Sequence, residues 1–362
     1  MRRKLITILC LVITGLLIWL IPALIEGYPI RRDGAIRQKD WQGTLRVWVC
    51  QDWSSGFSAW LMEQAAAFEK QHSGTHVRIQ RVQPGAWETP GAVLPDVLLF
   101  APGSLGNPQD YLRPFEGTSD FIEEAARSGR WMARQYALPV ALGGYVALVN
   151  EALYPASGTL SDPGVLKKTQ RYAIGAPYSG GVAALLGWER GISAARSLPL
   201  PDGFGASTAD AMYAKFTQGS IAALICPIDY ARKFAALESV GRGFAYRVET
   251  PLLPFTDMII HIGRFKNNAP RGADEKANQL TLYLLSHQAQ SKLQNYGLIP
   301  ARLDTVPTSS APVICELHSQ YINRLVIPNT FGWGEARERF LNEALHALRN
   351  GGDASEAIER IR

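Results

Sequence analysis

The stretch over residues 136–155 constrains the fold more than any other part of the chain. It reads YALPVALGGYVALVNEALYP, in which two apolar runs flank the pair Gly143-Gly144. Connectors that cross a protein surface are polar and rich in Pro, Gly and Ser, whereas the β-branched and aromatic residues here suit buried strands. The stretch is therefore expected to be a connector that is itself part of the core. Such a connector predicts two lobes that share a hinge, with the ligand beside it.

The length of the chain also predicts two lobes. A single core stops growing beyond roughly 250 to 300 residues, and this chain has 362. Strand-like runs alternate with helical spacing, beginning with a strand over 44–50 and a helix over 56–71. This alternation predicts α/β lobes with largely parallel sheets, in which ligands gather beyond the carboxyl ends of the strands.

Residues 5–25 carry no charge and follow the basic Arg2-Arg3-Lys4. A bilayer needs about 20 apolar residues of helix, and no small-residue cleavage site follows this segment, so 1–25 is predicted to be an uncleaved signal anchor, with a cleaved signal as the alternative. The polar, irregular residues 26–40 are then a tether. The prediction is a single-pass cell-membrane protein with its binding domain on the extracytoplasmic side.

The net charge of +5 lies at the N-terminus. Residues 1–39 hold seven Lys and Arg against two acids, and the remaining chain has 30 of each sign. Nucleic-acid binding needs a clustered basic face, so nucleic acid is not expected as a partner. Nucleotide-binding and nucleophile motifs are absent, and the four Cys and six His show no metal-ligand spacing. No cofactor, metal or catalytic residue is therefore predicted, and the chain is not expected to be an enzyme.

Candidate ligand contacts lie at predicted loops. Trp53 in QDWSSG and Trp333 in NTFGWGE stand among Gly and small polar residues instead of on a periodic apolar face. Asp52 and Asp229 follow strand-like runs, where they would bind ligand hydroxyls or an amine, or else cap the next helix. Aromatic faces suit small polar ligands, although core packing is the commoner role of such residues. The remaining aromatic candidates are Phe100, Tyr145, Tyr178 and Tyr230.

Four segments, in this order and spacing, resemble the extracellular solute-binding proteins of ABC importers, the group that includes the maltose-binding receptors. They are YALPVALGGYVALVNEAL, KFTQGSIAALICPIDY, the helix and Gly-x-Ile-Pro-Ala-Arg pattern of residues 273–302, and the C-terminal amphipathic helix followed by AIERI. The resemblance covers residues 44–362. It implies a type II periplasmic-binding fold, in which two α/β lobes, each a mixed sheet flanked by helices, close on a ligand.

The resemblance also implies the division of the chain. Lobe 1 would comprise residues 41–140 plus 252–303, and lobe 2 residues 141–251 plus 304–362. The lobes would flex at Gly143, Gly144 and Thr250, where the chain crosses between them.

Position by position, Phe100 and Tyr230 match places where the family often has a stacking aromatic, and Trp333 lies near another. Asp229 shares the loop of Tyr230, and Tyr178 falls in a loop that often lines the cleft. The sequence departs from the family at residues 226–230, where CPIDY replaces the usual Gly-aromatic pair, and in lacking a lipoprotein Cys.

The expected function is that of a membrane-anchored receptor that captures a small solute, a carbohydrate, between two lobes and delivers it to an ABC permease. Two alternatives remain open at this point. A membrane-tethered ligand sensor would have the same fold and signal to a partner, and a surface hydrolase would need a catalytic cluster that the sequence does not display.

Overall fold

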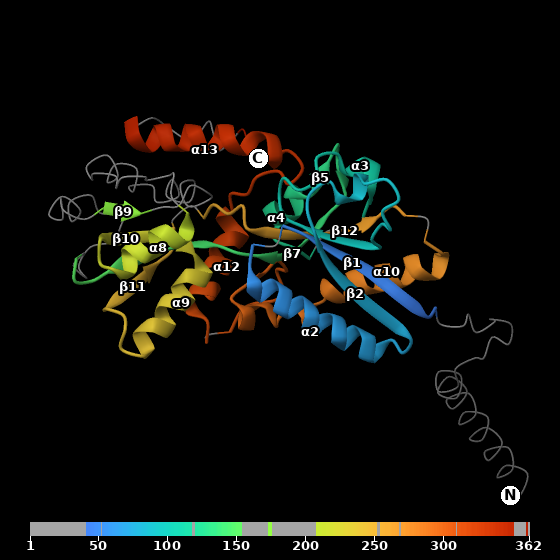
Figure 1. The fold of residues 1–362 in the computed structure, drawn as a ribbon, viewed down its shortest axis with the longest axis horizontal. Helices are drawn as coiled ribbons and strands as arrows, with labels where there is room; N and C mark the ends of the chain where they lie inside the picture. Colours follow the sequence, from blue (N-terminus) through green and yellow to red (C-terminus); the bar gives the residue numbers. More distant parts are fainter. Residues whose placement is uncertain are drawn as a thin grey trace, which may run out of the picture. The chain divides into compact units, whose positions relative to one another are not determined.

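Two β-sheets organise the chain (Figure 1). The computed structural model describes residues 41–51, 53–117, 120–153, 173–175, 208–251, 254–267, 269–308, 310–350 and 360. Both sheets belong to one compact unit that spans residues 42–362.

The larger sheet has seven strands in the order β13-β7-β12-β3-β1-β2, with β4 pairing with β12 outside this path. Central β1 is parallel to both β2 and β3, whereas β12 is antiparallel to β3 and β7. The predicted parallel pairing therefore holds for the first three strands, and strands added later in the chain make the sheet mixed. The strands are β1 (Gly43–Cys50), β2 (Thr75–Val82), β3 (Val97–Phe100), β4 (Leu112–Arg113), β7 (Leu138–Leu142), β12 (Ile259–Phe265) and β13 (Ile299–Pro300).

Helices α2 (Ser55–Gln71) and α10 (Arg271–Leu284) pack against the larger sheet. The apolar residues whose helical spacing predicted α2 are buried, among them Phe57, Trp60 and Phe68. After α10 the chain forms two short turns in place of one helix, α11 (His287–Gln290) and η3 (Leu293–Tyr296). The indole N–H of Trp60 donates to the Ala289 carbonyl at 3.0 Å, which a continuous helix would use for its own ladder.

Short elements follow β2 and β3 and precede β7. They are η1 (Ala86–Glu88), α3 (Pro108–Tyr111), α4 (Glu123–Ser128) and the hairpin of β5 (Arg130–Trp131) with β6 (Arg134–Gln135). A buried cluster that includes Trp48, Cys50, Phe100 and Phe331 fills the space between these elements and the sheet. Within this cluster, Cys50 is a buried free cysteine that packs as a small apolar residue.

The smaller sheet has four strands in the order β11-β8-β10-β9. Strand β8 is antiparallel to both β10 and β11, and β10 is parallel to β9. Helices α8 (Ala209–Thr217) and α9 (Ile228–Ser239) pack on β10 through an aromatic cluster of Phe216, Phe234 and Phe244. The strands are β8 (Tyr145–Asn150), β9 (Ala173–Gly175), β10 (Ile221–Pro227) and β11 (Tyr246–Glu249).

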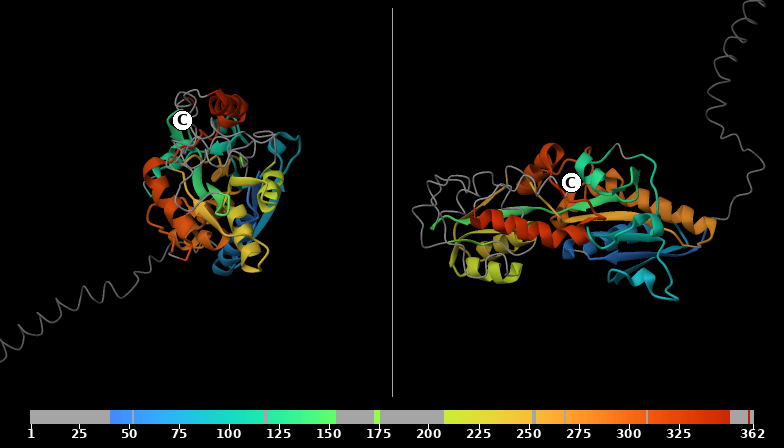
Figure 2. Two further views of the ribbon diagram at one scale, coloured as in Figure 1. Left: turned by 90° about the vertical axis from the view of Figure 1, so that its left-hand side faces the viewer. Right: turned by 90° about the horizontal axis from the view of Figure 1, so that it is seen from above.

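The chain passes directly from the larger sheet to the smaller one between β7 and β8, through Gly143-Gly144 (Figure 2). Every residue of both strands is buried, so the prediction of a connector that is itself core is confirmed. A return passage links β11 to β12. After β13 the chain forms α12 (Pro312–Arg324) and α13 (Trp333–Asn350), the second of which was predicted from its amphipathic pattern.

The predicted membrane anchor, residues 1–25, and the tether lie outside the described residues. Within the described ranges, no helix combines the length and the apolar character that a membrane span requires.

Candidate functional site

Gly143 and Gly144 are glycines because of space, not because of backbone conformation. Neither has a positive φ. A Cβ on Gly143 would lie 2.7 Å from Cη2 of Trp53 and 2.9 Å from Cβ of Met258, and a Cβ on Gly144 would lie 2.6 Å from the hydroxyl of Tyr321. The pair was predicted as a flexible hinge. The geometry adds a second reason for glycine here, which is that side chains approach this backbone from both sides.

We call five side chains near this crossing the junction site, because each is hydrogen-bonded to another of them or packs against Gly143: Trp53, Ser54, Tyr145, Asp229 and Asp257. The hydroxyl of Tyr145 donates to Oδ1 of Asp257 at 2.9 Å. The hydroxyl of Ser54 donates to Oδ2 of Asp229 at 3.0 Å, which joins residues 175 apart in sequence. The junction site therefore connects elements that follow strands of both sheets.

Local structure after β1 positions Trp53 and Ser54. Gln51 ends the strand with a φ of 57°, a left-handed conformation that is uncommon for a residue with a side chain. Its Oε1 accepts from the hydroxyl of Ser104 at 3.1 Å, so the loops after β1 and β3 are tied together. Ser54 then caps α2, because its Oγ accepts from the backbone N–H of Gly56 at 3.2 Å. These loops lie at the carboxyl ends of parallel strands, where α/β proteins bind ligands.

The two aspartates of the junction site come from other parts of the chain: Asp229 follows the smaller sheet's β10, and Asp257 lies in the return passage. Asp229 lies in the first turn of α9, whose first residue Ile228 donates its backbone N–H to the carbonyl of Gly144 at 3.0 Å. This bond fixes the start of α9 against the crossing. Asp257 precedes β12, and the backbone N–H of Gly143 donates to the neighbouring Met258 carbonyl at 2.6 Å. The residue next to each aspartate is therefore hydrogen-bonded to one of the two glycines.

The junction site offers two kinds of polar group. The indole N–H of Trp53 is buried and finds no acceptor among the described residues. Burial raises the pKa of Asp257, and the hydrogen bond from Tyr145 and the charge of Arg337 oppose this shift. The junction site thus holds an aromatic ring with a donor and two carboxylate acceptors, a set suited to a ligand that has both hydroxyl groups and an apolar face.

Two predicted stacking residues are placed in the core. Phe100 has no exposed surface and packs on Phe331, with ring centroids 6.1 Å apart. Trp333 is 3% exposed and packs on Phe340 at 5.6 Å and Phe255 at 6.4 Å. Rings without exposed surface cannot stack on a ligand in this arrangement. Core packing, the alternative that the sequence left open, accounts for both positions.

The hydroxyl groups of Tyr230 and Thr250 are hydrogen-bonded to neighbouring side chains. The hydroxyl of Tyr230 donates to Asp210 at 2.8 Å, its ring packs on Tyr213, and burial raises its pKa. The hydroxyl of Thr250 accepts from the amide of Gln320 at 3.0 Å and donates to a carboxylate on the same helix, α12. The predicted contacts Asp52 and Tyr178 lie outside the described residues.

Of the predicted contacts, Trp53, Tyr145 and Asp229 come together. Sequence reasoning missed Ser54 and Asp257. Ser54 had a usable signal, since Ser directly before a helical pattern predicts an N-cap, whereas Asp257 in PFTDM follows no recognisable motif. Among the described residues, no three His, Cys, Asp or Glu side chains are arranged to hold a metal ion.

Comparison with known proteins identifies the fold. No protein-family model matches the sequence, and the curated protein sequences contain no match either. The structure resembles the GacH receptor of Streptomyces glaucescens, with a TM-score of 0.62 at 17% identity over 89% of this chain and 97% of that one. It also resembles the cyclic alpha-maltosyl-1,6-maltose binding protein of Arthrobacter globiformis, with a TM-score of 0.61 at 13% identity over 88% and 97% of the two chains.

A third solved structure is the ABC substrate-binding protein Lmo0181 of Listeria monocytogenes, with a TM-score of 0.57 at 14% identity over 88% of this chain and 97% of that one. The chain has the solute-binding protein fold. The mixed α/β, two-lobed architecture implied by the sequence resemblance is thereby confirmed. In this solute-binding fold the two sheets form the two lobes, and the junction site lies where the chain crosses between them.

Proposed function

We propose that this chain is a membrane-anchored receptor that binds a carbohydrate at the junction site and delivers it to an ABC permease. The observation that carries the proposal is the junction site itself. It places an unpartnered indole N–H and two carboxylates at the crossing between the lobes of a solute-binding fold. The non-enzymatic role of the structural neighbours supports a receptor over a hydrolase.

Carbohydrate fits the chemistry of these groups. A sugar ring has an apolar face for the indole of Trp53 and hydroxyl groups that donate to carboxylates and accept from an indole N–H. The GacH receptor was solved in complex with acarbose and Lmo0181 in complex with cycloalternan, which supports this ligand class.

The two lobes would close on the ligand because the residues that contact it come from both sheets. Ser54 follows β1 of the larger sheet, and Asp229 opens α9, which follows β10 of the smaller sheet. A ligand shifts an equilibrium between arrangements only by its preference for one of them. A sugar hydroxyl that takes the place of Ser54 as donor to Asp229, while the ring lies on Trp53, contacts both sheets and so favours the arrangement in which they are close.

Binding is tested by calorimetry and thermal unfolding of the full chain with maltose, maltotriose, acarbose and cycloalternan, beside spermidine and amino acids. A ligand of the native state raises the unfolding temperature. Trp53→Phe keeps an aromatic ring, although a smaller one, and removes the N–H, so it should weaken binding about tenfold. Trp131→Phe is the matched control, because that indole N–H is also buried and unpartnered but lies in β5. Unchanged affinity in Trp53→Phe, or no stabilisation by any sugar, would remove the proposal.

The membrane anchor and the permease are the remaining parts of the proposal. The uncharged residues 5–25 support an anchor. Deleting residues 1–40 should release the protein from the membrane fraction of expressing cells. Uptake of the bound sugar should stop in cells that carry only the released form in the surrounding medium. Continued membrane association of the shortened chain would place the anchor elsewhere.

A further inference from the structure

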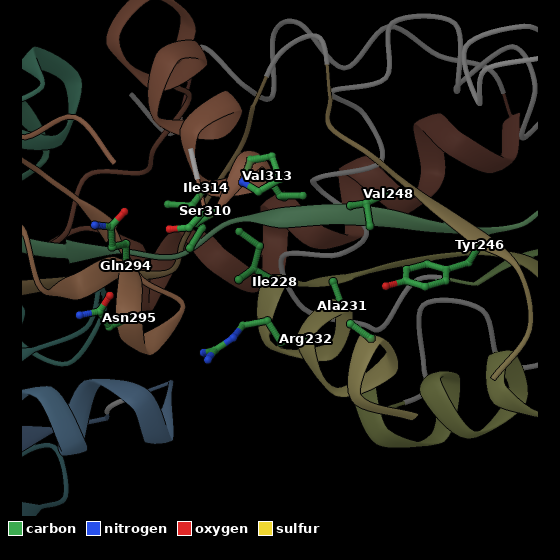
Figure 3. A pocket seen from close by; sticks show the side chains of 13 residues that line it. Ile228, Ala231, Arg232, Tyr246, Val248, Gln294, Asn295, Ser310, Val313 and Ile314 are labelled. Atoms are coloured by element: carbon green, nitrogen blue, oxygen red, sulfur yellow. The ribbon is translucent and has the colours of Figure 1, made fainter. Parts of the chain in front are cut away.

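A pocket of about 470 Å³ lies away from the junction site, between α9 and the start of α12 (Figure 3). Its walls come from α9 and β11 on one side, and from η3 and residues 310–314 on the other. This volume falls within the range of about 300 to 1,000 Å³ that is usual for small-molecule sites.

The pocket lies on the α12 side of the crossing. Ile228 lines it, and the backbone N–H of this residue donates to the carbonyl of Gly144. Gly144 faces Tyr321 and Leu317 of α12, whereas Gly143 faces Trp53. The pocket and the junction site are therefore separate, with the first turn of α9 between them.

The pocket walls are mainly apolar. Ile228, Ala231 and Ala235 lie on one face of α9 at helical spacing, opposite Pro312 and Ile314 at the start of α12. Removing apolar ligand surface from water against such walls is worth about 25 cal/mol per Å². The body of a ligand for this pocket is therefore apolar.

Arg232 is the one charged residue among those that line the pocket. No hydrogen bond or ion pair joins its guanidinium to another described residue. It points from α9 toward Gln294 and Asn295 (Figure 3), and a Cβ on Gly297 would lie 2.4 Å from its Nη1. Guanidinium groups bind carboxylates through paired, charge-assisted hydrogen bonds.

The start of α12 adds to the positive potential. Ala311 precedes this 13-residue helix without a side-chain cap, and residues 311–314 line the pocket. The first backbone N–H groups of a helix lack intrahelical acceptors and carry partial positive charge. Among the described residues, no carboxylate lines the pocket to neutralise these groups.

We propose that this pocket is a second ligand site, which binds a small monocarboxylate with an apolar body through Arg232 and the apolar walls. The proposal does not depend on carbohydrate binding at the junction site. An organic anion in this pocket would contact two elements. One is α9, which packs on the smaller sheet, and the other is η3, which precedes β13 of the larger sheet.

The test uses phenylacetate as the probe and phenylacetamide as its neutral match, in calorimetry with the full chain and no sugar present. Phenylacetate should bind, and the amide should bind about tenfold more weakly or not at all. Arg232→Gln should weaken phenylacetate binding about tenfold. Ala235→Phe should abolish it by filling the pocket from an exposed helical position.

Lys233→Gln is the matched control, because it removes the same charge from the next residue of α9. Lys233 lies over the ring of Tyr230 at 4.2 Å and does not line the pocket. Phenylacetate affinity should be unchanged in this variant. Equal weakening in Lys233→Gln and Arg232→Gln, equal binding of acid and amide, or no binding of phenylacetate to the unmodified chain would each overturn the proposal, whatever the sugar titrations show.

Discussion

The two faces of the Gly143-Gly144 crossing are built differently. On the junction face, Gly143 contacts Trp53, which is partly exposed and whose indole N–H has no acceptor among the described residues. On the α12 face, Gly144 contacts Leu317 and Tyr321, which are almost fully buried. The hydroxyl of Tyr321 donates to the carbonyl of Gly143 at 2.8 Å, so the polar atom on this face is satisfied.

This difference indicates that the α12 face supports the fold and that the junction face binds the ligand. Close packing with satisfied hydrogen bonds resists any change of shape, because the packed atoms have no room to shift. A partly exposed ring with a free donor gains partners when a ligand arrives. We therefore expect variants on the α12 face to change stability, and variants on the junction face to change affinity.

The largest effect is expected from Leu317→Ala on the α12 face. Leu317 is fully buried, and truncation of such a residue costs about 2 to 5 kcal/mol of unfolding free energy. Chemical denaturation measures the loss, and Trp53→Phe, on the junction face, should lose less than about 1 kcal/mol. A larger loss from Trp53→Phe than from Leu317→Ala would reverse the comparison.

The two glycines give a more closely matched pair. Gly144→Ala pushes a methyl group against the buried Tyr321 and Leu317, and overpacking of this kind costs about 1 to 3 kcal/mol. Gly143→Ala meets the outer edge of the partly exposed Trp53 ring and also Cβ of the buried Met258, so it should destabilise the protein by a similar amount and cause the greater loss of sugar affinity. Denaturation measures the unfolding free energy of both variants, and titration measures their sugar affinity. Equal values of both quantities in the two variants would show that the faces are equivalent.

The buried histidines should make the folded protein less stable as the pH falls. Burial lowers the pKa of His261 from 6.5 to about 3, and it also lowers the pKa of His318 on α12. Below pH 6.5 the unfolded chain binds protons that these native histidines do not, so stability falls as the pH falls. For His261 alone the loss at pH 5.5 is about 1.4 kcal/mol.

Denaturation at pH 7.5 and pH 5.5 measures this loss. His261→Gln keeps a side chain able to bond Ser128 and Thr330, the two partners of the ring. The variant should remove most of the drop between the two pH values, whatever its stability at pH 7.5. A drop of the same size in the variant would show that His261 is not its source.

The smallest effect is expected at Asp257. Burial raises the pKa of this carboxyl group, so the ionised form lowers the stability of the folded protein as the pH rises above about 4. Asp257→Asn keeps an acceptor for Tyr145 and should raise the unfolding free energy at pH 7 by less than about 1 kcal/mol, while sugar affinity falls.

Asp304→Asn is the control of opposite sign. The guanidinium of Arg302 lowers the pKa of Asp304 to about 2, so its ionised form stabilises the folded state above the unfolded pKa and this variant should lose stability at pH 7. Destabilisation by Asp257→Asn together with unchanged affinity would show that the Asp257 carboxylate has a structural role only.

The sequence by itself determined the local elements and the path of the chain between the sheets. Alternating apolar residues predicted β1 and the helical spacing of Phe57 and Phe68 predicted α2, because burial of one face depends only on residues close in sequence. The apolar runs around Gly143-Gly144 predicted the crossing for the same reason. The predicted bounds of these two elements, 44–50 and 56–71, each begin one residue after the observed start.

Only the tertiary structure decided which side chains meet at the crossing. Trp333 had the same sequence signal as Trp53, yet Trp333 packs in the core, as Phe100 does, and Trp53 lies at the junction. The contact of Ser54 with Asp229 joins segments 175 residues apart, and the two glycines are required by side chains from three other parts of the chain. Such contacts depend on how distant loops are placed on the two sheets, and that placement has no local pattern from which it could be inferred.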